Sequence, residues 1–245
     1  DDDEGLGRLS RDMGLSLNLS EMRAIREWYA ARSRQPTDAE LETIAQTWSE
    51  HCKHKTFGAI VHHDGETIDH LLKSTVFRAT RDLARDWCVS VFKDNAGIVR
   101  FDDRYNLCVK VETHNHPSAI EPYGGAGTGL GGVIRDILGT GLGARPIANL
   151  NALRFGERSH PRTRFLVENC VKGIGDYGNC VGIPNIGGEV VFARAYAGNP
   201  LVNAMAIGLL RVGELIKGEA KGVGNARMTV GARTENARVF YNATG

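Results

Sequence analysis

One nine-residue stretch carries most of the side chains in this sequence that could do chemistry. Residues 109–117 read Val-Lys-Val-Glu-Thr-His-Asn-His-Pro, so polar groups recur at every second position. Side chains alternate between the two faces of a β-strand, and one face is expected to carry Lys110, Glu112, His114 and His116. The opposite face is apolar enough to pack on a core and carries Leu107, Val109, Val111 and Thr113. We therefore predict a ligand site on one face of this strand.

The charged side chains of this region suit a metal and a phosphate. Glu112 and Asp136 are hard oxygen donors, and Mg²⁺ typically takes one or two carboxylates and leaves its other positions to water and phosphate. The alternative is that both carboxylates form structural ion pairs with Lys110 and Arg135. His114 could act as a general base, because an imidazole titrates near neutral pH.

A glycine-rich segment follows the strand. Six glycines lie between residues 124 and 132, just before Arg135 and Asp136. Glycines let a backbone approach a ligand closely, and free amides at the start of a following helix suit phosphate oxygens. The run matches neither the dinucleotide-binding fingerprint nor the phosphate-binding lysine motif. A flexible connection or a tight helix-packing surface therefore stays open as an alternative.

A second cluster of reactive side chains begins at Glu50 and reads Glu-His-Cys-Lys-His-Lys. A capping-box pattern and helical spacing upstream place His51 near the end of a docked helix that leads into a loop. His51, Cys52 and His54 could be zinc ligands, but no second pair at finger-like spacing completes four. Cys52 is also a weak candidate nucleophile, because sequence neighbours on a helix point in different directions.

The order of patterns predicts an α/β (α+β) fold with a helical beginning. Residues 1–55 read as helices, with Ser20 as a cap and a break at residues 33–36. From residue 56 to about 212, short β runs alternate with helical segments, which is typical of an α/β domain. The β runs are expected at residues 107–111, 164–166, 190–192 and 201–210. Residues 173–189, where glycines flank Asp176, Asn179 and Asn185, are expected to form a second ligand-facing loop.

Composition limits the classes of partner and compartment. Thirty Lys and Arg residues nearly balance 29 Asp and Glu residues, so neither nucleic acid nor an acidic membrane is expected as the principal partner. Five cysteines without framework spacing are typical of reduced thiols in a cytoplasmic protein. No apolar stretch approaches the roughly 20 residues of a membrane span, and the acidic start differs from a signal peptide. We therefore expect a cytoplasmic location.

Several motifs in a fixed order resemble the phosphoribosylformylglycinamidine synthase family. These synthetases make formylglycinamidine ribonucleotide in purine biosynthesis. The resemblance runs from about residue 9 to about residue 234 and is carried by residues 50–55, 110–123, 131–136, 175–180 and 184–189.

The resemblance also implies roles for individual residues. His51 matches the active-site histidine and His114 the proton acceptor. Lys110 falls where ATP is contacted, and His54 occupies a position where many members have an ATP-contacting tyrosine. Two carboxylates match the Mg²⁺ ligands, Glu112 and Asp136. The residues that match substrate contacts are Thr113, His114, Asn115, His116 and Arg135.

The implied reaction activates the formylglycinamide oxygen with ATP as a phosphorylated imidate, which ammonia then attacks. Phosphoryl transfer depends mainly on positioning and charge neutralisation, which explains a site of Lys, Arg, two carboxylates and Mg²⁺. The implied partners are formylglycinamide ribonucleotide, a glutaminase that supplies ammonia from glutamine, and a small accessory subunit. The implied enzyme is thus a carbon–nitrogen ligase with glutamine as amido donor.

The family architecture implies three parts. Residues 1–55 form a helical segment, residues 56–212 a mixed-sheet domain like the N-terminal domain of aminoimidazole ribonucleotide synthetase, and residues 213–245 the start of a truncated partner domain. In that superfamily two such sheets associate across a dimer or pseudo-dimer. Family members are far longer, and residues 235–245 have no family counterpart, so the chain is expected to be an N-terminal fragment that is inactive when isolated.

Two other functions stay open. One is a different ATP-using member of the superfamily, with aminoimidazole ribonucleotide, selenophosphate or thiamine-phosphate chemistry. The motifs around His51 and His114 favour formylglycinamidine synthesis over it. The other is a non-catalytic nucleotide-binding or assembly piece, which would bind nucleotide without turnover.

Overall fold

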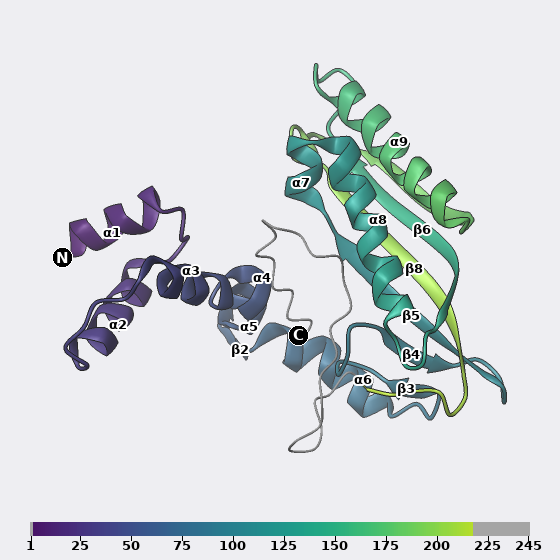
Figure 1. The fold of residues 1–245 in the computed structure, drawn as a ribbon, viewed down its shortest axis with the longest axis horizontal. Helices are drawn as coiled ribbons and strands as arrows, with labels where there is room; N and C mark the ends of the chain where they lie inside the picture. Colours follow the sequence, from purple (N-terminus) through teal and green to yellow (C-terminus); the bar gives the residue numbers. More distant parts are fainter. Residues whose placement is uncertain (1, 218–245) are drawn as a thin grey trace, which may run out of the picture. The chain divides into compact units, whose positions relative to one another are not determined.

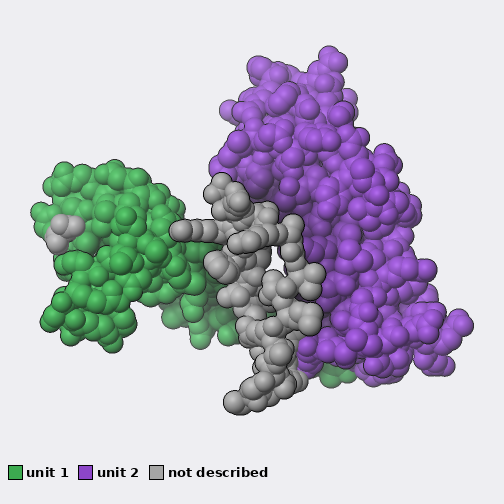
Figure 2. Space-filling view, viewed as in Figure 1, with its two compact units in different colours: residues 1–84 green, residues 85–245 purple. Residues whose placement is uncertain are grey.

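The structure, a computed structural model, describes residues 2–217. The chain forms two compact units, unit 1 up to Ala84 and unit 2 from Arg85 (Figure 2). The boundary expected after residue 55 falls inside unit 1. Most of the expected third part, residues 213–245, lies outside the described residues, as do residues 235–245.

Unit 1 is mainly helical, which confirms the helices expected over residues 1–55 (Figure 1). One cluster of buried side chains joins its first three helices, with Met22 and Tyr29 among its most buried members. A two-stranded antiparallel hairpin and further helical turns complete the unit. Its elements are α1 (Asp3–Asp12), α2 (Leu19–Ala30), α3 (Asp38–Thr47), α4 (Glu50–Lys53), α5 (Lys55–Gly58), β1 (Ile60–His63), β2 (Glu66–Asp69), a π-helical turn (Lys73–Phe77) and α6 (Arg78–Leu83).

Two capping boxes set the starts of α2 and α3. Thr37 and Glu40 form the expected box at α3, where the Glu40 carboxylate accepts from the Thr37 amide at 2.9 Å. The Ser20 cap expected for α2 is wrong. Asn18 caps that helix, accepting from the Glu21 amide at 3.0 Å while Glu21 accepts from the Asn18 amide. Asn18 wins because Glu21 stands three residues after it, which completes the reciprocal box.

Unit 2 contains a mixed six-stranded sheet in the order β3-β4-β5-β8-β6-β7. All neighbouring strands are antiparallel except β6 and β7, which are parallel. The mixed sheet with its helices confirms the expected fold class. The strands are β3 (Cys88–Ser90), β4 (Gly97–Arg100), β5 (Tyr105–Thr113), β6 (Arg145–Phe155), β7 (Asn185–Phe192) and β8 (Leu201–Arg211). The helices are α7 (Asn115–Ile120), α8 (Pro122–Leu138), α9 (Thr163–Val181) and a 3₁₀ turn (Arg194–Tyr196).

Helices α8 and α9 cover one face of this sheet (Figure 1). Their apolar side chains share one core with Cys108 of β5 and with alternate residues of β6 and β8. The fully buried members include Cys108, Leu130, Phe155, Leu166 and Val202. On the opposite face of β5, Val111 is 57% exposed. Within residues 85–217, the helices that share the core pack on the face of the sheet that carries Cys108. We call the other face, which carries Val111, the open face.

The expected strands at 190–192 and 201–210 are confirmed as parts of β7 and β8. The expected strand at 164–166 is wrong, because these residues belong to α9. The loop expected at 173–189 is also wrong, because α9 continues to Val181 and β7 begins at Asn185. The reason is visible at Gly173, where an added Cβ would overlap the Tyr123 carbonyl of α8. That glycine permits close helix packing, and the packing outweighs its low helix propensity.

All five cysteines are free thiols, as expected. Burial raises the pKa of Cys108 and of Cys170 to about 11, so neither is a thiolate at neutral pH.

Across residues 2–217, none of the helices has both the length and the apolar character of a membrane span.

Candidate functional site

A cluster of three charged side chains forms where β5 meets α8. The Lys110 ammonium lies 3.1 Å from Glu112 Oε1 and 3.1 Å from Asp136 Oδ2. Lys110 and Glu112 stand two residues apart on β5, and Asp136 comes from α8 across the helix–sheet interface. The exposed fractions of the three side chains are 19%, 35% and 13%. We call this set the carboxylate–lysine cluster.

Electrostatics keep Lys110 protonated in this cluster. Burial lowers the pKa of Lys110, but hydrogen bonds to Glu112 and Asp136 outweigh burial and raise it above its ordinary value. The ion pairs considered as the alternative to metal binding are therefore present, with Lys110 as the shared cation. Two carboxylates bridged by one ammonium still carry a net negative charge.

The alternation expected along β5 is confirmed for Lys110 and Glu112, but the assignment of the faces is wrong. The face expected to pack on the core is the open face, where Val111 is exposed. The polar face continues from the buried Asn106 and Cys108 and faces α8. Sequence alternation separates two faces, but which face a helix covers depends on contacts far along the chain.

The strand covers the run expected at 107–111, but it ends before the alternation expected up to His116. It ends at Thr113, His114 precedes α7, and His116 lies inside α7 and is exposed. The prediction that His116 shares the strand face with Lys110 is therefore wrong. Pro117 sits in the first turn of α7, where its missing N–H costs no helical hydrogen bond, so a helix follows directly.

The glycine run expected to approach a ligand lies within α8 instead. Of the two alternatives, the tight packing surface is the one observed. A Cβ added at Gly129 would lie 3.0 Å from His114 Nδ1, and one at Gly132 would lie 3.2 Å from Glu112 Oε2. The first amides of α8 are also not all free, because the Glu121 carboxylate accepts from the Gly124 amide. The glycines therefore leave room for the site side chains.

We predict that this clearance can be measured by replacing Gly129 with alanine. Alanine raises helix propensity by about 1 kcal/mol, but contact with the His114 ring costs about 1–3 kcal/mol as overpacking. The matched control is Gly175→Ala in α9, where an added Cβ meets nothing within 4 Å. In urea denaturation Gly175→Ala should be stabilising and Gly129→Ala at least about 1 kcal/mol less stable than Gly175→Ala. Equal gains from both would show that Gly129 provides no clearance.

Unpaired buried polar atoms mark the chain between β5 and α7. His114 Nδ1 and Asn115 Oδ1 are buried and have no hydrogen-bond partner among residues 2–217, whereas the buried Ser118 hydroxyl has the Cys170 thiol beside it. Buried polar groups are nearly always hydrogen-bonded, so two unpartnered atoms on adjacent residues need a cause. A polar ligand that meets this segment would supply the partners. Sequence reasoning missed Ser118, and its place in a short helix gave no signal.

The other expected substrate contacts are less concentrated. Thr113 is exposed at the end of β5, where its hydroxyl donates to Asn203 of β8. Arg135 is exposed on α8, next to Asp136. The structure thus brings Lys110, Glu112 and Asp136 into direct contact, and it packs His114 and Glu112 against neighbouring glycines of α8.

The second group of expected site residues lies in unit 1. His51 is exposed in α4, whose start is capped by Ser49 accepting from the Cys52 amide at 3.3 Å. His54 ends α4 with a φ of 53°, a left-handed conformation uncommon for a residue other than glycine. The Glu50 carboxylate supports this turn by accepting from the Thr56 amide at 3.1 Å. The reactive cluster is therefore a tight, exposed turn between two short helices.

The carboxylate–lysine cluster has the donor chemistry of a Mg²⁺ site shared with phosphate. Glu112 and Asp136 supply two hard carboxylates, and Lys110 holds both of them at one point. Among residues 2–217, no group of three or more His, Cys, Asp or Glu side chains could hold a metal by itself. Mg²⁺ suits two carboxylates, because it keeps water and phosphate oxygens in its other positions.

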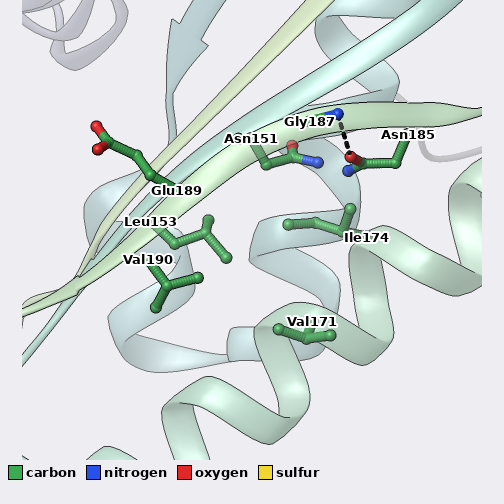
Figure 3. A pocket seen from close by; sticks show the side chains of 9 residues that line it. Asn151, Leu153, Val171, Ile174, Asn185, Gly187, Glu189 and Val190 are labelled. Carbon is green, nitrogen blue, oxygen red and sulfur yellow. Dashed lines mark hydrogen bonds between the residues drawn. The ribbon is translucent and has the colours of Figure 1, made fainter.

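A separate pocket of about 440 Å³ opens between β7 and α9 (Figure 3). Its lining is mostly apolar, but Asn151 of β6 is only 7% exposed, and its Oδ1 has no hydrogen-bond partner in the part of the chain that the structure describes. Asn185 accepts from the Gly187 amide at its rim. The segment 173–189 lines this pocket through Ile174 and residues of β7, although it is no loop. The sequence signal for this pocket was a pair of amides in an apolar strand, Asn149 and Asn151, both of which are buried. The sequence-based prediction did not use it.

Two family models match the chain. The AIR synthase related protein N-terminal domain matches residues 93–210, which cover most of the described part of unit 2. The formylglycinamide ribonucleotide amidotransferase linker domain matches residues 6–55.

Curated relatives carry both regions in one polypeptide. The phosphoribosylformylglycinamidine synthase subunit PurL of Thermoplasma volcanium is 38% identical over 95% of this chain and 29% of its own length. The PurL subunit of Mycolicibacterium vanbaalenii is 45% identical over 90% of this chain and 27% of its own length. The chain therefore spans less than a third of these relatives.

Solved structures give the same similarity. Thermotoga maritima PurL complexed with FGAR is 36% identical, with a TM-score of 0.59 over 82% of this chain and 28% of that protein. The same protein complexed with ATP gives a TM-score of 0.59 at 36% identity.

Proposed function

The chain belongs to the phosphoribosylformylglycinamidine synthase family, and on that premise we propose that it supplies part of an ATP-dependent ligase site. The reaction joins formylglycinamide ribonucleotide, ammonia and ATP into formylglycinamidine ribonucleotide, ADP and phosphate, a step of purine biosynthesis. The observation that carries the proposal is the carboxylate–lysine cluster, in which Lys110 bridges Glu112 and Asp136. We call this chain together with the further length found in its relatives the assembled synthetase.

In the proposed site, Glu112 and Asp136 hold Mg²⁺ and Lys110 contacts the phosphates of ATP. Mg²⁺ would neutralise charge that develops on the transferred phosphoryl group. Lys110 is suited to its part because its side chain is only 19% exposed and its ammonium remains charged. An ammonium binds phosphate more strongly in a partly buried site than in open solvent, because the effective dielectric constant is lower there.

His114 is proposed as the proton acceptor. When ammonia replaces the phosphorylated oxygen, nitrogen must lose a proton, and a neutral imidazole can take it. His114 Nδ1 is buried and has no hydrogen-bond partner among the described residues, which supports this role because a hydrogen-bonded nitrogen would already be occupied. Contacts to formylglycinamide ribonucleotide are assigned to Thr113, His114, Asn115, His116 and Arg135.

Unit 1 is proposed to contribute His51 as a catalytic histidine and His54 as an ATP contact. The exposed turn that ends α4 supports this, because both imidazoles are accessible there. A histidine at position 54 can hydrogen-bond or stack on a nucleotide in place of tyrosine.

The proposed partners are a glutaminase that releases ammonia and a small accessory subunit. Nucleic acid and membrane have no part in the proposal, and the expected location is the cytoplasm. Residues 1–55, 56–212 and 213–245 stay the proposed functional divisions of the chain.

The open face of the sheet is proposed to meet a second sheet of the same family, in the same or another chain. We expect the chain by itself to associate through this face, because exposed apolar surface drives association. Val111→Glu should lower the apparent mass in light scattering, whereas Val181→Glu at the exposed end of α9 should leave it unchanged. A monomer at every concentration, or an unchanged mass for Val111→Glu, would contradict this use of the face.

The direct test of the proposed function is synthesis by the assembled synthetase. Formylglycinamidine ribonucleotide and ADP should appear together when formylglycinamide ribonucleotide, ATP, Mg²⁺ and ammonium salts are supplied without glutamine. Omitting any one of them should stop both products. ATP hydrolysis that is unaffected by formylglycinamide ribonucleotide would reject the proposal.

A further inference from the structure

Lys110 occupies the place between two carboxylates that a metal would need. Its ammonium lies 3.1 Å from an oxygen of Glu112 and 3.1 Å from an oxygen of Asp136. Mg²⁺ binds carboxylate oxygens at about 2.0–2.1 Å, so it would draw the same oxygens inward. A divalent cation and an ammonium cannot share this gap, because their charges repel at such short distance.

The surroundings of the two carboxylates explain why they need a cation at all times. Only 35% of the Glu112 side chain and 13% of the Asp136 side chain are exposed. The residues of β8 opposite Lys110 and Glu112 are Ala206 and Ala204, which offer no polar side chain. Two carboxylates held close together and largely out of water destabilise a fold unless a positive charge compensates them.

We propose that Lys110 is an internal counter-ion that holds the metal site together until Mg²⁺ arrives with the nucleotide. Glu112 and Asp136 would hold Mg²⁺ when it is bound, and the Lys110 ammonium, no longer needed between them, would pair with the nucleotide phosphates. Mg²⁺ alone must displace Lys110 without giving it a new partner, so Mg²⁺ alone binds weakly. This exchange rests on the proposed function. Its consequence is that Lys110 makes the site bind the Mg²⁺–nucleotide complex more tightly than free Mg²⁺.

The test compares Lys110→Met with the unchanged full chain, using MgCl₂ as the probe and no nucleotide. With EDTA, Lys110→Met should melt about 3–6 °C lower, because the two carboxylates lose their cation. Titration calorimetry with MgCl₂ should show binding to Lys110→Met about tenfold or more tighter than to the unchanged chain, and Mg²⁺ should recover the lost melting temperature. Equal melting temperatures in EDTA, or equal Mg²⁺ affinities, would overturn the counter-ion role.

Two further variants separate charge from packing. Lys172→Met is the matched control, because Lys172 pairs with Asp176 at the same 3.1 Å but is exposed on α9. It should change neither the melting temperature nor Mg²⁺ binding. Lys110→Met combined with Glu112→Gln removes one of the two unpaired charges and should recover most of the lost stability. A double variant as unstable as Lys110→Met would assign the loss to the lysine alkyl chain and overturn the proposal.

The outcome is distinct from that of the proposed function. The melts and MgCl₂ titrations contain no ATP, so they measure the counter-ion by itself. A chain that passes them while the assembled synthetase makes no formylglycinamidine ribonucleotide would retain the counter-ion and lose the proposed reaction.

Discussion

Replacing Glu112 by glutamine is expected to lower turnover of the assembled synthetase about a hundredfold or more and to raise its Mg²⁺ requirement. Glutamine keeps the size of the side chain but removes the charge that would hold the metal. The fold should persist, because Glu112 is partly exposed and Lys110 keeps Asp136 as a partner. Turnover is measured against MgCl₂ concentration, and a thermal melt separates lost chemistry from lost structure.

The control for this variant is Glu168→Gln on α9. Glu168 is an exposed carboxylate that also pairs with a basic side chain, Arg164 at 2.7 Å. Exposed pairs of this kind contribute little to stability, so turnover and Mg²⁺ dependence should both stay unchanged. An unchanged Mg²⁺ dependence for Glu112→Gln would remove Glu112 from the metal site.

Replacing His51 by alanine is expected to lower synthesis about a hundredfold or more even when free ammonia is supplied. The proposed role of His51 lies in forming the new carbon–nitrogen bond, so bypassing glutamine cannot restore the rate. Because His51 is exposed in the short helix α4, the melting temperature should hardly change. The measurement is the initial rate with saturating ammonium salts at constant ATP.

Two companions define the meaning of this result. His63→Ala removes an exposed histidine of β1 in the same unit and should retain the full rate. His54→Tyr restores the residue common in the family and should be tolerated. A normal ammonia-dependent rate for His51→Ala would make His51 a structural residue.

The parts of the fold that the sequence predicted are those controlled by neighbouring residues. The capping box of Thr37 and Glu40 starts α3 as expected, and β8 follows its hydrophobic run. Such signals act within a few residues and need no knowledge of the rest of the chain. The choice of Asp136 as a partner of Glu112 is different, because the two residues lie on separate elements, and it came from the family resemblance.

The errors lie where distant contacts decide. Glycines let a backbone approach a ligand closely, so the run in α8 was a candidate phosphate contact, with a tight helix-packing surface as an alternative that the sequence could not decide. In the structure the glycines allow α8 to approach Pro117, Gly173 and the side chains of His114 and Glu112. These contacts involve residues up to about 50 positions away, and the same packing decides which face of β5 is covered. Local sequence patterns therefore predict neither the helix packing nor the covered face of β5.

The fate of the amide oxygen of formylglycinamide ribonucleotide tests the central claim most directly. If ATP activates this oxygen at the carboxylate–lysine cluster, the oxygen leaves on phosphate when ammonia attacks. When the assembled synthetase turns over substrate labelled with ¹⁸O at the amide, each phosphate released should therefore contain one ¹⁸O, measured by mass spectrometry. Glu112→Gln should slow the appearance of labelled phosphate and of product equally. Unlabelled phosphate alongside formylglycinamidine ribonucleotide would contradict the proposed activation.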